Sequence, residues 1–117
     1  MASEIIAIFV GMNPKEQFTF EIRMRVRDYE VDSQGIVNNA NYLHYMEHTR
    51  HEFCREAGTT FRDMQARGID PVLSRVDIRY KQPLRLGDEM LSRLTMRRIG
   101  ARFIFDQTIL NAAISPE

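Results

Sequence analysis

Residues 28–43 read Asp28-Tyr29-Glu30-Val31-Asp32-Ser33-Gln34-Gly35-Ile36-Val37-Asn38-Asn39-Ala40-Asn41-Tyr42-Leu43, and this stretch decides the fold. Its first half has turn chemistry, because an Asp can bond the backbone two residues on and Gly35 can adopt positive φ. Asn38 or Asn39 can then cap a helix. The stretch therefore predicts a tight turn that holds a carboxylate at the entrance of a helix.

A long helix is expected from Asn39 to Ala57. Gly58 is a natural helix end, and a short second helix is expected over residues 59–67. The apolar stripe that would face the core recurs at helical spacing: Leu43, Met46, Arg50, Phe53 and Ala57.

Strands are expected before and after the helix. Residues 17–29 alternate with period two, which is typical of a half-buried strand. Residues 71–81, 89–98 and 102–111 predict three further antiparallel strands, with a hairpin turn over residues 99–101. One amphipathic helix against an antiparallel sheet makes an α+β domain.

The N-terminal segment is open to two interpretations. Residues 4–10 are rich in β-branched side chains, so they are either a strand or a disordered lead-in. Gly11-Met12-Asn13-Pro14 follows as a break. We therefore expect an N-terminal extension over residues 1–13 and one domain over residues 14–117.

The composition excludes several classes of protein. Sixteen acidic and sixteen basic residues cancel, so no net field attracts nucleic acid or anionic lipid. Cys54 is the single cysteine, which rules out an internal disulfide and indicates a reducing compartment, the cytoplasm. No stretch is long enough to cross a membrane, and Glu4 lies where a signal peptide has a basic residue.

Asp32 has a structural and a functional interpretation. It is a turn-former, or it is a carboxylate beside the free N–H groups of a helix start, where an oxyanion would be stabilised. A carboxylate in that place can attack as a nucleophile or activate water. If the preceding strand continued, Asp28 and Glu30 would lie on the same strand face as Asp32. For these two acids, however, ion pairs with arginines on neighbouring strands are the favoured interpretation.

Other polar groups are weaker candidates. The three histidines lie along one helical side at His44, His48 and His51, but they lack His-Glu-x-x-His order and neighbouring arginines would repel a cation, so no metal site is expected. Cys54 is expected to be a buried structural thiol. Three arginines flank the hairpin turn and either bind phosphate or solvate the sheet edge: Arg97, Arg98 and Arg102.

These residues form a recognisable pattern. Asp32-x-x-Gly35-x-Val37-Asn38-Asn39-x-x-Tyr42, followed by Glu47-x-x-Arg50, resembles the hotdog-fold acyl-CoA thioesterases of the 4-hydroxybenzoyl-CoA thioesterase type. The resemblance covers about residues 17–112 and is nearest to the branch with plant and cyanobacterial acyl-ACP and 1,4-dihydroxy-2-naphthoyl-CoA thioesterases. Pro83-Leu84-x-x-Gly87-Asp88 also fits the family pattern.

The resemblance implies a long central helix wrapped by a curved antiparallel sheet, in homodimers or homotetramers with sites at subunit interfaces. It implies that Asp32 is the catalytic carboxylate, that the Asn39 N–H polarises the thioester carbonyl of acyl-CoA or acyl-ACP, and that no metal or cofactor is needed. A non-catalytic acyl-thioester-binding module is the alternative; a hydratase would need a histidine at the helix start. The remaining positions expected to contact substrate are Gly35, Val37, Asn38, Tyr42, Arg97, Arg98 and Arg102.

One departure from the family pattern concerns the last strand. Relatives have a further strand after the one that ends near Leu110, inside the sheet. Residues 111–117 are too short to supply it, and Ser115-Pro116 is a poor strand former. Three explanations are open: the sequence is a fragment, residues 4–10 fill the gap, or a partner chain does.

Overall fold

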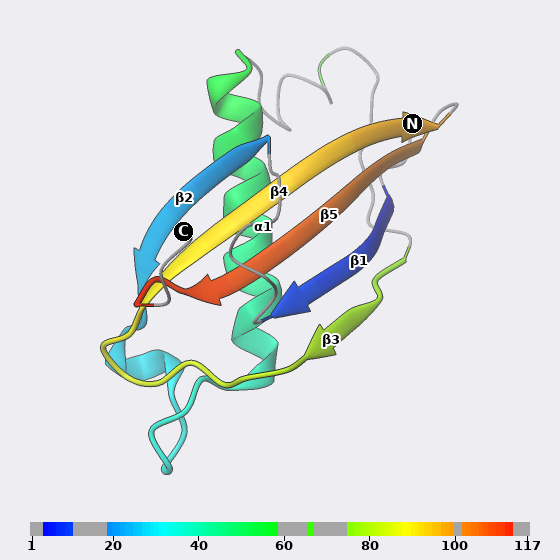
Figure 1. Ribbon diagram of the computed structural model, residues 1–117. Coiled ribbons are helices and arrows are strands. Elements are labelled where there is room, and N and C mark those ends of the chain that lie inside the picture. Colours follow the sequence, from blue (N-terminus) through cyan, green and yellow to red (C-terminus); the bar gives the residue numbers. More distant parts are fainter. Residues whose placement is uncertain (1–3, 11–18, 59–65, 67–74, 100–101, 114–117) are drawn as a thin grey trace.

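The computed structural model describes residues 4–10, 19–58, 66, 75–99 and 102–113. Helix α1 (Asn39–Glu56) crosses one face of a curved five-stranded sheet, shown in Figure 1. The strands are β1 (Glu4–Val10), β2 (Phe20–Arg25), β3 (Ile78–Tyr80), β4 (Glu89–Ile99) and β5 (Arg102–Asn111). This arrangement confirms the predicted α+β fold class with one long helix wrapped by a sheet.

The sheet differs from the expected run of three consecutive antiparallel strands. Its order is β2-β4-β5-β1-β3, and only the β2–β4 and β4–β5 pairs are antiparallel. Strand β3 does not pair with β4; it lies at the far edge of the sheet, parallel to β1. Strand β1 runs parallel to both of its neighbours, β5 and β3.

The N-terminal strand β1 therefore lies inside the sheet, between β5 and β3. This is the kind of interior place in which relatives are expected to have a strand after the one that ends near Leu110. Val10 pairs with Ile109 of β5 on one side and with Tyr80 of β3 on the other. Backbone groups that an open gap would leave unpaired are bonded in this way. The division between an extension over residues 1–13 and a domain over residues 14–117 stays a prediction.

Two predicted strands are shorter than expected. The strand over residues 17–29 becomes β2, and a 3-10 helix (Asp28–Glu30) follows it. Asp28, Glu30 and Asp32 therefore do not share a strand face. The strand over residues 71–81 is reduced to β3 among its described residues, 75–81. Apart from Ala66, which is helical, the short helix expected over residues 59–67 lies outside the described residues.

The helix ends where the sequence predicts, but its buried face is rotated. Gly58, at φ +87°, follows the C-cap Ala57. Met46 and Arg50 are buried as expected, whereas Leu43 is 40% exposed. The buried face includes polar side chains that a search for apolar spacing passes over, and its full set is Tyr42, Tyr45, Met46, Thr49, Arg50 and Cys54.

Polar contacts join this face of α1 to the sheet. The Thr49 hydroxyl lies 2.6 Å from the Ser92 hydroxyl and donates to the Tyr45 carbonyl. Arg50 is 9% exposed, and its guanidinium donates to the Gln107 Oε1 at 2.9 Å. Burial lowers the pKa of Arg50 to about 10, although the negative charge of Glu47 acts to raise it. Because these polar groups are hydrogen-bonded to one another, they can be buried between the helix and the sheet.

Candidate functional site

The turn before α1 is held by Asp32. Its Oδ1 accepts the N–H of Gln34 at 2.8 Å and that of Ile36 at 3.4 Å. Its backbone N–H donates to the Ile36 carbonyl at 2.9 Å, and Gly35 closes the turn at φ +79°. The structure thus shows the turn-forming role of Asp32 directly, and Gly35 supplies the positive φ that the turn requires.

The Asp32 carboxylate keeps one oxygen available. The side chain is exposed, and within the described part of the chain its Oδ2 accepts no hydrogen bond. Among the described residues, the carboxylate accepts no hydrogen bond from the N–H groups that begin α1. Its catalytic role stays a prediction.

The start of α1 has one free backbone donor. Asn38 caps the helix, because its Oδ1 accepts the Ala40 N–H at 3.0 Å and its carbonyl accepts the Asn41 N–H at 2.9 Å. The Asn39 N–H has no acceptor among the described residues. A free amide at the positive end of an 18-residue helix is suited to a negatively charged or strongly polarised oxygen.

Glu30 anchors this helix start. Its carbonyl accepts the Asn38 N–H at 3.1 Å and the Asn41 Nδ2–H at 2.8 Å. Its buried carboxylate accepts the Arg27 N–H at 2.7 Å and pairs with the Arg27 guanidinium at 3.0 Å. Burial raises the pKa of Glu30, but the bonds and charge of Arg27, together with the Tyr45 hydroxyl, outweigh burial and bring that pKa below its usual value.

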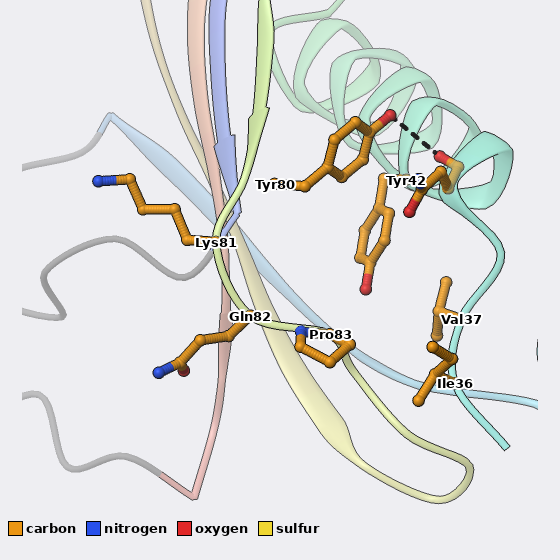
Figure 2. Close-up of a pocket in the computed structure, with 8 residues that line it drawn as sticks. Ile36, Val37, Tyr42, Tyr80, Lys81, Gln82 and Pro83 are labelled. Atoms are coloured by element: carbon orange, nitrogen blue, oxygen red, sulfur yellow. Dashed lines mark hydrogen bonds between the residues drawn. The ribbon is translucent and has the colours of Figure 1, made fainter. Parts of the chain in front are cut away.

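A pocket of about 140 Å³ opens between the helix start and the segment after β3. Figure 2 shows its lining, which consists of Ile36, Val37, Asn39, Tyr42, Tyr80, Lys81, Gln82 and Pro83. The structure thus brings together three residues of the predicted site, Val37, Asn39 and Tyr42. The sequence did not identify residues 80–83 as part of the site, because Gln82-Pro83 indicates only that a strand ends there.

Two tyrosines form the aromatic wall of this pocket. The ring centroids of Tyr42 and Tyr80 lie 5.6 Å apart. The Tyr80 hydroxyl donates to the Asn39 carbonyl at 3.3 Å, and the Tyr42 hydroxyl accepts the Leu84 N–H at 2.9 Å. Tyr42 is 2% exposed and Tyr80 is 44% exposed. Burial raises the pKa of the Tyr42 hydroxyl.

Other predicted site residues lie outside the pocket lining. Asp32, Gly35 and Asn38 are its neighbours along the chain, and Ile36 connects Asp32 to it through the N–H to Oδ1 bond. The backbone of Arg97, Arg98 and Arg102 lies at the β4–β5 hairpin, at the end of the sheet away from the start of α1 (Figure 1). The backbone of these three residues therefore lies at the opposite end of the sheet from the helix start that borders the pocket.

The histidines and Cys54 are the remaining candidates. Within the described ranges, no group of three His, Cys, Asp or Glu side chains could hold a metal ion. Cys54 is buried, which raises the pKa of its thiol, and the charge of Arg50 only partly offsets this. No described helix has the length and apolar character needed to cross a bilayer.

Comparisons with known proteins agree on one family. Residues 26–115 match the thioesterase-like superfamily. The chain is 36% identical over 90 residues to the chloroplastic acyl-acyl carrier protein thioesterase ATL3 of Arabidopsis thaliana, which covers 76% of this chain and 47% of the relative. It is 30% identical over 95 residues to the acyl-CoA thioester hydrolase YbgC of Escherichia coli, which covers 80% and 70%.

Solved structures share the fold. A hypothetical protein from Aquifex aeolicus superposes with a TM-score of 0.75 at 34% identity, over 83% of this chain and 78% of that one. The chain spans about half the length of the Arabidopsis relative, 47%.

Proposed function

Because this chain belongs to the thioesterase-like superfamily, we propose that it hydrolyses acyl thioesters of coenzyme A or acyl carrier protein to a free acid and a thiol. The names of its relatives support this activity. The observation that carries the proposal is the start of the 18-residue helix, where the Asn39 N–H has no acceptor among the described residues and Asn39 lines an aromatic-walled pocket.

The proposed reaction uses the helix start as an oxyanion site. The thioester carbonyl oxygen accepts the Asn39 N–H, and the helix dipole stabilises the negative charge that develops as the carbonyl is attacked. Asp32 either attacks through Oδ2 and forms a mixed anhydride that water then cleaves, or takes a proton from a water that attacks the carbonyl directly. The carbon–sulfur bond breaks, the thiolate leaves, and one water is consumed overall.

The turn suits Asp32 to this role. The N–H groups of Gln34 and Ile36 fix Oδ1 and orient the exposed carboxylate, and Ile36 itself lines the pocket. We propose a homodimer or homotetramer in which substrate lies between subunits and a partner's hairpin arginines approach the phosphates of coenzyme A. The buried, unpaired Cys54 thiol suits a reducing compartment, and we propose the cytoplasm.

The test is a thiol-release assay over a panel of acyl-CoA and acyl-ACP substrates, with the melting temperature measured in parallel. The proposal expects enzyme-dependent thiol release from at least one acyl class. Absence of release from the whole panel by the folded protein would refute hydrolysis.

A second candidate is a module that binds acyl thioesters without cleaving them. One observation favours it: Asp32 does not line the pocket, and its Oδ1 is used by its own turn. This candidate expects acyl-CoA to raise the melting temperature without thiol release, since a ligand that binds only the folded state stabilises it.

A further inference from the structure

The loop over residues 31–37 carries Asp32 and is closed at its base by backbone hydrogen bonds. The Asp32 N–H donates to the Ile36 carbonyl at 2.9 Å. One step further from the tip, the Asn38 N–H donates to the Glu30 carbonyl at 3.1 Å. These bonds close the loop on itself and lie before the first residue of α1, so the placement of the loop against the helix depends on further contacts.

Asn41 supplies a bond from the helix itself to this loop. Its Nδ2–H donates to the Glu30 carbonyl at 2.8 Å, so this oxygen accepts one hydrogen from the loop and one from the first turn of α1. The backbone N–H of Asn41 donates to the Asn38 carbonyl at 2.9 Å. That carbonyl belongs to the same peptide group as the Asn39 N–H. Asn41 therefore bonds both to the arm that leads to Asp32 and to the peptide that begins the helix.

Helix propensity does not account for an asparagine at this position. Asn41 is half-buried in the first turn of α1, and asparagine is a weak helix former because its side chain competes with the helix for backbone hydrogen bonds. Alanine would favour the helix more. The bond to the Glu30 carbonyl offsets this cost, and its effect is to join the loop to the helix.

We propose that Asn41 is a positioning residue, which holds the Asp32 carboxylate in place relative to the Asn39 N–H. This inference rests on the proposed function, in which these two groups act on the same thioester. Asn41 does not line the pocket, and it acts through the Glu30 carbonyl. Val31 alone separates Glu30 from Asp32, so a shift of that carbonyl displaces the carboxylate. A misplacement of about 1 Å can slow an enzyme by about a hundredfold.

The test compares Asn41→Ala with His44→Ala. His44 is an exposed residue three positions further along α1, and its replacement leaves the bond to the Glu30 carbonyl in place. Both changes introduce a better helix former, so both variants should melt close to the wild-type temperature. Asn41→Ala should lower kcat by about ten- to a hundredfold and leave KM within about twofold, because the pocket lining is unchanged. His44→Ala should keep wild-type kcat and KM.

Hydrogen–deuterium exchange gives a second measurement, which does not depend on activity. The Asp32 and Asn38 amides are bonded across the loop base and exchange when that base opens. Asn41→Ala should speed exchange of both amides by about fivefold, the effect of losing one hydrogen bond. The amide of Met46, in the middle of α1, should exchange at its wild-type rate. His44→Ala should leave all three rates unchanged.

Two results would overturn the inference. Wild-type exchange of the Asp32 and Asn38 amides in Asn41→Ala would show that the side chain does not hold the loop. Faster exchange with a wild-type kcat per folded molecule would assign Asn41 a structural role only. If the wild-type protein itself releases no thiol from any substrate, the proposed hydrolysis fails, and the exchange rates still decide whether Asn41 fixes the loop against the helix.

Discussion

Replacing Asn38 by Asp should separate the stability of this fold from its activity. The Asn38 Oδ1 caps α1 by accepting the Ala40 N–H at 3.0 Å. A carboxylate keeps this acceptor and adds a negative charge at the positive end of the helix, which contributes about 0.3–1 kcal/mol. The free energy of unfolding of Asn38→Asp should therefore equal the wild-type value or exceed it by up to about 1 kcal/mol.

The same charge should slow hydrolysis. It would lie beside the Asn39 N–H, where the proposed oxyanion develops. Two like charges about 6 Å apart repel by about 3 kcal/mol at an effective dielectric constant of about 20, and by about 0.7 kcal/mol in water. The pocket is partly open, so we expect a loss in kcat of about 5- to 100-fold.

Urea unfolding and thiol release measure the two effects. Asn38→Ala is the control, because it removes the cap without adding charge and should cost about 1 kcal/mol of stability while the folded fraction keeps most of its turnover. A stable Asn38→Asp protein with wild-type turnover would refute the oxyanion site at the start of α1.

Two further predictions concern buried charges. Gln107→Leu should lower the free energy of unfolding by about 3 kcal/mol, because the Arg50 guanidinium loses its acceptor; adding Arg50→Met should recover most of this loss in urea titrations. The pKa of Glu30 is lowered in the folded state, so its stabilisation is present above its unfolded pKa and is lost as pH falls through the folded pKa. Glu30→Gln should therefore be less stable than wild type at pH 6, and unfolding measurements should show this difference shrinking below about pH 4.

The long helix and its entrance could be predicted from the sequence because their signals are local. The Asp32 to Gly35 turn, the Asn38 cap and the Gly58 end depend on residues only a few positions apart. The hairpin of β4 and β5 is local in the same sense, since its strands are consecutive. Such features follow from the residues that form turns and from the periodicity of apolar residues along the chain.

The sheet order could not be predicted in the same way. Pairing of β1 with β5 joins residues about a hundred positions apart, and no spacing in the sequence specifies a partner at that distance. The pocket shows the same limit, because Tyr80 reaches Tyr42 through the placement of β3 at the sheet edge.

The turnover of Asp32→Asn on the best thioester substrate tests the central claim most directly. An asparagine keeps the oxygen that accepts the Gln34 and Ile36 N–H groups, so the turn should persist while the nucleophile or base is lost. Asp28→Asn is the control, since Asp28 is a nearby exposed acid. The account predicts at least about a hundredfold fall in kcat for Asp32→Asn and wild-type turnover for Asp28→Asn; a folded Asp32→Asn protein that hydrolyses at the wild-type rate would contradict it.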